Sequence, residues 1–300
     1  MFGTVLWDVY TRDQTPEVHR ALDGVASAED NYGWASTAVY AFYDPGRTGT
    51  RNGVDPLLYI GLAVDVPNRF AQHNALYPTP ARSCKREQIA HWFTEHERLG
   101  FATFVQSPLD QAHVARFKKA IDGDVDWSEE FAYDQDSRDA IATLEGQLIE
   151  ASRLGTGALP RWNKVGGSRT GAGQAKGGIG ASLIALLTGA TDNLFVARRS
   201  IRELWTDDEA CEFEMDLLHP ARTQALMSAT DAPAGNTEIR ARLLDTARGR
   251  ALFADAFNTE RIARMTARNY LESSTRSSVS GRLHGSDASG ERLPFDYAAR

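Results

Sequence analysis

Residues 57–73 constrain the fold more than any other segment, because they join a strand pattern, a turn and a helix start. Residues 57–61 read Leu-Leu-Tyr-Ile-Gly, a short apolar run that ends at a glycine and is typical of a strand. Asp65 is expected to accept hydrogen bonds from the first free amides of the helix that follows. On that helix Arg69 and His73 lie four residues apart and share one face. A guanidinium and an imidazole presented together indicate chemistry on a phosphodiester.

Two further motifs flank this segment. An alternating apolar run upstream contains Ala-Val-Tyr at residues 38–40, and Glu145 and Asn163 follow far downstream. In this order the motifs resemble the GIY-YIG nuclease superfamily, whose second motif matches Tyr-Ile-Gly at residues 59–61. The resemblance covers residues 36–166 and implies six site residues: Tyr40, Tyr59, Arg69, His73, Glu145 and Asn163.

The chain departs from the family pattern in two places. Ala38 stands where the first motif of the family has glycine, a small change that matters only if the backbone there needs a positive φ. The segment between Tyr40 and Tyr59 is longer than usual and carries turn residues at 44–46 and 52–53, which suit an extended hairpin loop. A longer loop is compatible with the strands, because loop closure entropy grows slowly with length.

The pattern predicts an α+β fold, with a small three-stranded antiparallel sheet flanked by helices and followed by a mostly helical C-terminal module. Apolar residues at helical spacing between the second and third strands predict a helix, and His96 on that stripe is interpreted as a packed core histidine rather than a ligand. The strands are expected at residues 37–43, 56–61 and 101–106. The expected division is an N-terminal extension at 1–35, a nuclease domain at 36–166, a glycine-rich linker at 167–180, a helical module at 181–272 and a flexible tail at 273–300.

The resemblance implies a role for both tyrosines and for the arginine. Tyr40 would act as general base and Tyr59 would orient water or phosphate, whereas outside the family both are ordinary strand aromatics. An unperturbed phenol has a pKa near 10 and is a poor base at neutral pH, so this role requires cationic neighbours that lower the pKa of Tyr40. Arg69 would clamp the phosphate in the transition state, and a surface salt bridge is its alternative.

The same resemblance makes Glu145 the single metal ligand. One carboxylate with coordinated waters suits one Mg²⁺ or Mn²⁺ ion, and the alternative is a boundary glutamate paired with a basic side chain. His73 is expected to pass a proton on or to bond the phosphate, and Asn163 is expected to support the site by bonding backbone groups. Four cations are predicted to bind the substrate: Lys85, Arg86, Lys164 and Arg169.

Composition argues against several other classes of protein. A formal charge of −7 disfavours a protein that coats nucleic acid nonspecifically. The two cysteines, Cys84 and Cys211, are too few for a disulfide framework or a cysteine-rich zinc site and are expected to be buried, reduced thiols. The acidic run at 122–139 lacks the glycine and glutamate that a calcium loop requires. The glycine-rich run at 166–180 lacks the Gly-Lys-Ser/Thr triplet of a phosphate-binding loop.

No basic segment precedes a long apolar run at the N-terminus, so no secretory signal is expected. The apolar stretch at 179–190 is too short to cross a bilayer, which needs about 20 residues, and the chain is placed in the cytoplasm with no membrane partner. Within the helical module, Thr206 to Glu209 is interpreted as a capping box at the start of a helix.

The predicted function is a divalent-metal-dependent endonuclease that hydrolyses DNA phosphodiester bonds, with RNA left open as a substrate. The C-terminal module would bind DNA, a protein partner or a second copy of the chain. Two alternatives remain open from the sequence: a non-catalytic nucleic-acid-binding module on the same fold, and a protein-interaction protein whose motif matches are accidental.

Overall fold

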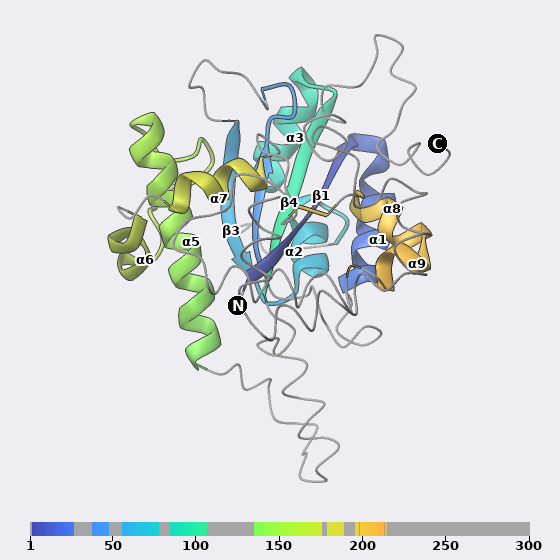
Figure 1. Ribbon diagram of the computed structural model, residues 1–300. Coiled ribbons are helices and arrows are strands. Elements are labelled where there is room, and N and C mark those ends of the chain that lie inside the picture. The colour runs from blue at the N-terminus through green and yellow to red at the C-terminus, as the bar shows by residue number, and fades with distance from the viewer. Residues whose placement is uncertain are drawn as a thin grey trace, which may run out of the picture.

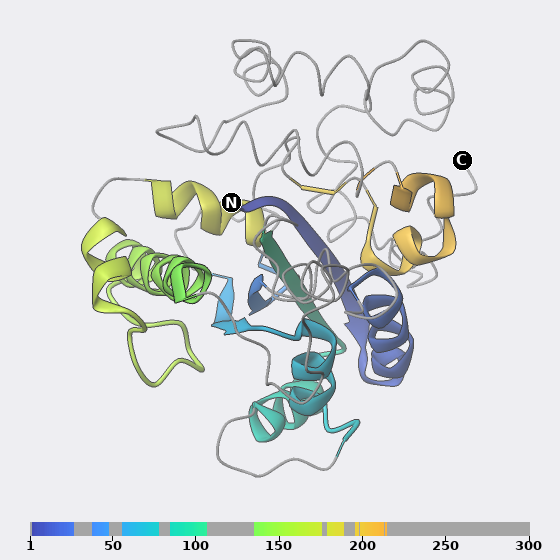
Figure 2. The same ribbon diagram turned by 90° about the horizontal axis from the view of Figure 1, so that it is seen from below.

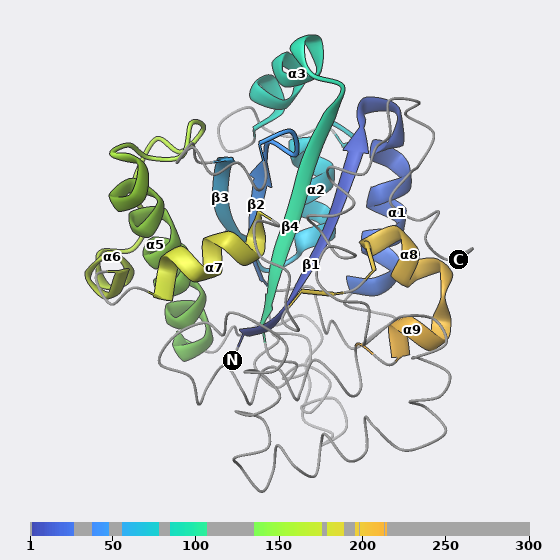
Figure 3. The same cartoon turned by 45° about the horizontal axis from the view of Figure 1, so that its top comes forward.

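The computed structural model describes residues 2–26, 38–47, 56–77, 85–106, 135–175, 179–188, 196–197, 199–212 and 214. Within these residues one sheet has the strand order β1-β4-β2-β3, and every neighbouring pair is antiparallel. Its strands are β1 (Phe2–Thr11), β2 (Ala38–Tyr43), β3 (Leu57–Ala63) and β4 (Arg98–Gln106). Figure 3 shows the four strands side by side, with β3 and β1 at the two edges.

The predicted α+β class is confirmed, but the prediction of three strands was wrong. The three predicted strands are β2, β3 and β4, and β1 adds a fourth that pairs with β4 from Phe2 to Thr11. The apolar, strand-like start of the chain was predicted as part of an N-terminal extension and not as part of the sheet. Strand β1 is covered on both faces: Val5 and Trp7 pack into one core cluster, and Leu6 packs into the other. A strand buried on both faces lacks the apolar and polar alternation that marks a half-exposed strand.

Helices cover both faces of the sheet, as Figures 1 and 2 show. Side chains of α1, α2, α3 and α8 contribute to the core cluster on one face, and those of α5 and α7 contribute to the cluster on the other. The helices are η1 (Arg12–Gln14), α1 (Thr15–Ala26), α2 (Val66–His73), α3 (Arg86–Glu95), α5 (Gln135–Thr156), α6 (Arg169–Gln174), α7 (Ile179–Leu187), α8 (Ile201–Thr206) and α9 (Asp208–Glu212).

Helix α2 begins as its sequence predicts. Asp65 is the N-cap, its carboxylate accepts a hydrogen bond from the Asn68 amide at 2.8 Å, and a proline lies in the first turn. Val66 and Phe70 bury one side of the helix against the sheet. This packing fixes the orientation of the Arg69 and His73 side chains.

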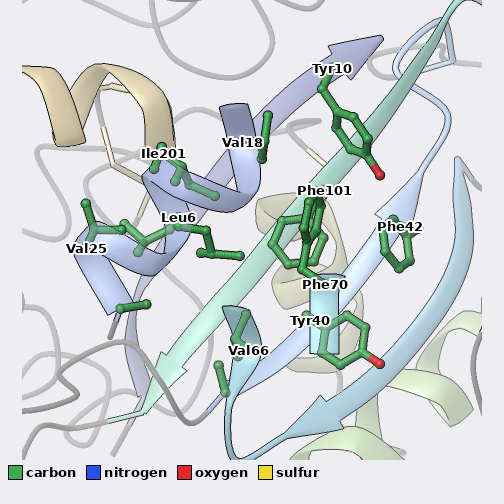
Figure 4. Close-up of a cluster of buried hydrophobic side chains, with 14 of the residues drawn as sticks. Leu6, Tyr10, Val18, Val25, Tyr40, Phe42, Val66, Phe70, Phe101 and Ile201 are labelled. Carbon is green, nitrogen blue, oxygen red and sulfur yellow. The ribbon is translucent and has the colours of Figure 1, made fainter. Parts of the chain in front are cut away.

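An aromatic cluster fills the sheet face under α2. Phe101 lies at the centre, with ring centroids 5.0 Å from Phe70 and 5.4 Å from Phe42. The ring of Tyr40 packs against the same group, 6.0 Å from Phe101, as Figure 4 shows. Offset and edge-on aromatic contacts of this kind are rigid, so the Tyr40 hydroxyl is held at a defined place at the margin of the core.

The glycine-rich run contains a packed helix where a linker was expected. Residues 169–174 form α6, which lies against α5 (Figure 1). A Cβ atom added to Gly171 would lie 2.0 Å from the Thr143 carbonyl oxygen, and one added to Gly146 would lie 2.4 Å from the Ser168 carbonyl oxygen. These glycines are therefore required for the close approach of α5 and α6, rather than for flexibility.

The segment after α7 returns to the edge strand β1. The Ala197 amide donates to the Val5 carbonyl at 2.9 Å, and the Trp7 indole donates to the Ala197 carbonyl at 3.0 Å. Helix α8 then packs on α1 and carries Arg202, whose guanidinium bonds the fully buried Asp8 at 2.8 Å. This segment is therefore fastened to the sheet by backbone pairing and by a buried ion pair.

One local prediction in this region was wrong. The capping box belongs to Ser200 and Glu203 at the start of α8, whereas Thr206 ends that helix and donates its hydroxyl to the Arg202 carbonyl at 3.1 Å. Cys211 is half-buried, whereas a buried thiol was expected. No helix among the described residues is long and apolar enough to cross a membrane. Residues 215–300, Cys84, and the acidic run up to residue 134 lie outside the described residues.

Candidate active site

The candidate site lies along the outer edge of β3. Backbone groups at this edge that pair with no other described strand bind residues of α5 and of the segment after it. Asn163 accepts from the Ile60 amide at 2.9 Å and donates to the Ile60 carbonyl at 2.8 Å. The Trp162 amide donates to the Leu58 carbonyl at 2.7 Å. The Asn163 side chain thus takes the place of a neighbouring strand at Ile60, and its predicted role at the site stays a prediction.

Glu145 reaches the same edge from α5. Its carboxylate accepts a hydrogen bond from the amide of Leu62, which is two residues after Ile60 on β3. Burial raises the pKa of Glu145, and the Leu62 amide offsets this only in part. Among the described residues, Glu145 has no ion pair within 4 Å. A half-buried carboxylate without a cationic partner has a capacity to bind positive charge.

The two tyrosines meet on the adjacent face of the sheet. Tyr40 lies opposite Gly61 in the pairing of β2 with β3, and its ring centroid is 5.9 Å from that of Tyr59. Their hydroxyl groups are hydrogen-bonded to each other. The charge of Arg69 lowers the pKa of both phenols, and the charge of Glu145 raises it. The structure therefore brings the two phenols, the guanidinium and the carboxylate of the prediction into one neighbourhood.

His73 extends this arrangement, and its tautomer follows from its two contacts. The Lys85 amide donates to Nδ1 of His73 at 2.8 Å, so this nitrogen carries no proton. Burial lowers the pKa of His73 to about 3, with help from the charges of Arg69 and Lys85, and the ring is therefore neutral at pH 7. Its proton lies on Nε2, which donates to the Tyr40 hydroxyl at 2.6 Å.

The pKa values of the phenols differ from the sequence-based expectation. Burial raises the pKa of Tyr40 well above 10, the Tyr59 hydroxyl and Glu145 act in the same direction, and Arg69 opposes them without prevailing. The pKa of Tyr59 is also raised by burial, and the hydrogen bond from Tyr40 offsets part of this rise. The expectation that cationic neighbours lower the pKa of Tyr40 is not met by the residues of the chain alone.

Gly61 makes room for both phenol hydroxyls. A Cβ atom at this position would lie 2.8 Å from the hydroxyl oxygens of both Tyr40 and Tyr59. We expect Gly61→Ala to displace the hydroxyls and to slow any reaction at this site by about 10²-fold, because displacing a catalytic group by about 1 Å is enough for a loss of that size. The matched control is Gly155→Ala, where the added Cβ meets nothing within 4 Å. Equal rates for the two variants would contradict the expectation.

The ionisation of His73 gives a second test, one that needs no substrate. Unfolded chains protonate this imidazole below pH 6.5, whereas the folded protein resists protonation down to about pH 3. Stability therefore falls by up to about 1.4 kcal/mol per pH unit within that window and is unaffected by His73 above it.

His73→Gln keeps an acceptor for the Lys85 amide and a donor for Tyr40 but cannot titrate. We expect the wild-type protein to lose about 2 kcal/mol more than this variant between pH 6.5 and pH 5, measured as free energies of unfolding in guanidinium chloride. Parallel pH profiles for the two proteins would show that His73 titrates normally.

The four predicted substrate-binding cations do not form one group. The Lys85 ammonium lies 4.6 Å from the centre of the Tyr59 ring and donates to the Trp162 carbonyl at 2.8 Å, so it belongs to the site. Arg86 directly follows Lys85 and Lys164 directly follows Asn163 in the sequence, and both are exposed. Arg169 is exposed at the start of α6, and no described contact connects it with the tyrosines.

Sequence reasoning missed the part played by Trp162. Its amide bonds β3 and its carbonyl bonds Lys85, so it connects the sheet edge to the start of α3. No sequence signal would have found this role, because both contacts use backbone atoms, which every residue has.

A divalent cation is consistent with the donor set. Glu145 provides one carboxylate without an ion pair among the described residues, beside two phenol oxygens. No group of three or more His, Cys, Asp or Glu residues capable of holding a metal occurs in the described part of the chain. A single carboxylate with coordinated waters is a donor set that a hydrated Mg²⁺ or Mn²⁺ ion accepts.

Comparisons with protein-family models, characterised proteins and solved structures gave no match to this chain.

Proposed function

We propose that this protein is a divalent-metal-dependent endonuclease of the GIY-YIG type that hydrolyses DNA phosphodiester bonds. One observation carries the proposal: Glu145, 83 positions beyond Leu62, bonds the Leu62 amide and acts on the same two phenols, Tyr40 and Tyr59, as Arg69 does. A glutamate on an unrelated helix face would not have come close to both phenols.

Arg69 is the proposed phosphate clamp. It is half-buried on α2, and it makes no ion pair within 4 Å among the described residues. A guanidinium presents a planar fork of donors that matches two phosphoryl oxygens and keeps its charge at any working pH. Its preorganised charge would stabilise the negative charge that gathers on those oxygens in the transition state.

Proton transfer is assigned to the hydrogen-bonded chain of His73, Tyr40 and Tyr59. Because His73 donates to Tyr40, the Tyr40 hydroxyl is left to donate to Tyr59. Each hydroxyl or imidazole of the chain donates to the next one, and the half-buried Tyr59 accepts the last of these bonds. Because an accepted hydrogen bond stabilises the phenolate, Tyr59 is the phenol that ionises more easily. We assign to Tyr59 the general-base role that the motif order gave to Tyr40, and to Tyr40 the role of orienting it.

Glu145 would hold the metal ion. When bound, Mg²⁺ or Mn²⁺ supplies positive charge that lowers the pKa of nearby oxygen acids and neutralises the phosphoryl oxygens. The residues of the chain then have three tasks. Arg69 positions the phosphate. The Lys85 ammonium, which donates to the Trp162 carbonyl, holds the Tyr59 ring by a cation–π contact, and Asn163 keeps β3 and the segment after α5 together.

The test is nicking of supercoiled plasmid in Mg²⁺ or Mn²⁺, followed by gel electrophoresis. We expect Arg69→Ala and Glu145→Gln to lose activity by at least about 10²-fold. Matched controls are Arg20→Ala on the exposed side of α1 and Glu150→Gln on the same helix as Glu145, and both should cut at the wild-type rate.

Two outcomes would overturn the proposal. Equal nicking by all variants would assign the activity to a contaminant or to another site. Absence of cleavage of DNA and RNA by the wild-type protein in either metal, with DNA still bound in chelator, would favour the non-catalytic binding module.

A further inference from the structure

A cavity of about 460 Å³ lies at the other end of β3 from Gly61. The buried Leu57, Leu58 and Pro160 line it together with the stacked rings of Trp92 and His96, which lie 3.7 Å apart and nearly parallel. The lining residues come from the turn after β2, from β3, from the end of α3, and from the end of α5 and the segment after it. The volume is in the range of about 300–1,000 Å³ that is typical of small-ligand sites, and the lining mixes apolar and polar groups.

The rim of this cavity is cationic. Arg47 and Arg161 both line it, and the only carboxylate among the lining residues, Asp44, is already paired with Arg47 at 3.1 Å. Arg161 is exposed and has no ion pair within 4 Å among the described residues. Stacked aromatic rings in the same cavity as an exposed arginine are suited to a flat, anionic ligand, such as a nucleobase with its phosphate.

The same three segments of the chain contribute residues to the cavity and to the candidate active site. Leu57, which lines the cavity, is four residues before Gly61 on β3, a distance of about 13 Å along an extended strand. Arg161 lines the cavity, and the next two residues, Trp162 and Asn163, bind Lys85 and Ile60 at the site. Helix α3 likewise runs from Lys85 at its N-cap to His96 at its C-cap. A nucleic acid strand bound at Arg69 would therefore reach this cavity within a few nucleotides.

We infer that the cavity lined by Leu58, Trp92, His96 and Arg161 is a substrate subsite that takes one nucleotide of the cleaved strand, with its base against the Trp92 and His96 rings and its phosphate at Arg161. This inference rests on the proposed endonuclease function. It adds a base-accepting position away from the scissile bond, and base extrusion into such a pocket is a source of selectivity for sequence or for distorted DNA.

The test is photocrosslinking of DNA in which bromodeoxyuridine replaces thymidine, carried out in chelator so that no cleavage is needed. Mass spectrometry of the digested complex should locate crosslinks at Trp92 or His96. Ala158 is exposed and lines the cavity, so Ala158→Phe should fill it and lower the yield of these crosslinks at least about tenfold. Crosslinks at Tyr59 should be unchanged in this variant.

Arg161→Ala should weaken DNA binding and reduce the slope of log Kd against log salt by about 1, whereas Arg20→Ala should leave both unchanged. Crosslinks confined to the Tyr59 region, together with unchanged binding by Ala158→Phe and Arg161→Ala, would overturn the subsite while leaving the endonuclease intact. Crosslinks at Trp92 or His96 in a protein that never cleaves would support the subsite and overturn the endonuclease.

A third arm separates substrate from free nucleotide. A mononucleotide, thymidine monophosphate, is titrated while the crosslinks to DNA are monitored. Competition between the two at Trp92 or His96 supports the subsite. Mononucleotide binding at these residues that DNA does not displace would assign the cavity to a free nucleotide, and absence of any DNA crosslink would also overturn the inference.

Discussion

Replacing Tyr59 by phenylalanine is expected to slow DNA nicking by about 10²–10⁴-fold, the usual contribution of a positioned general base. The change removes a single oxygen, and the ring keeps its contacts with Tyr40 and with the Lys85 ammonium. Binding of DNA in chelator should therefore be nearly unchanged. The measurement is the initial rate of plasmid nicking at saturating DNA, compared with the Kd for the same DNA.

The matching change at Tyr40 separates the roles of the two phenols. Tyr40→Phe removes the donor to Tyr59 and leaves His73 Nε2 without its acceptor, so we expect a smaller loss of rate, about tenfold. Tyr10→Phe is the control, because it removes another buried hydroxyl, one that donates to Asn74 of α2 at 2.9 Å on the same face of the sheet. A larger loss for Tyr40→Phe than for Tyr59→Phe would return the general-base role to Tyr40.

Asp8→Asn is expected to lower the free energy of unfolding by about 3–5 kcal/mol, because it leaves the Arg202 guanidinium buried without its main counter-charge. The Arg202 side chain is 2% exposed and bonds Asp8 through two of its nitrogens and the Val9 carbonyl through one. Such a loss is a large fraction of the 5–15 kcal/mol that typically stabilises a domain. Equilibrium unfolding in urea would measure it.

Two controls test whether burial causes this effect. Glu17→Gln removes the other carboxylate of the network, which is 45% exposed, and should cost less than about 1 kcal/mol. The double substitution Asp8→Val with Arg202→Met removes both buried charges together and should recover much of the loss of Asp8→Asn. Equal destabilisation by Glu17→Gln and Asp8→Asn would contradict this account.

The elements that the sequence predicted correctly have local causes. The strands β2, β3 and β4 were found from short apolar runs bounded by turn residues. Helix α2 was found from Asp65, whose bond to the Asn68 amide spans three residues. The segments that were misjudged lack such a cause. The glycines of α6 resemble a linker until α5 packs on them, and the membership of β1 in the sheet is recognisable only from its pairing with β4.

The sequence by itself determined which chemical groups are present and which short segments carry them: two strand tyrosines, an arginine and a histidine one helical turn apart, and a glutamate at the margin of a helix face. Only the tertiary structure decided how they meet. Asn163 bonds Ile60 across 103 positions, and the Lys85 amide fixes the His73 tautomer. Those contacts use backbone groups at a strand edge and a loop, and such groups are the same in every residue, so no pattern of side chains specifies their partners.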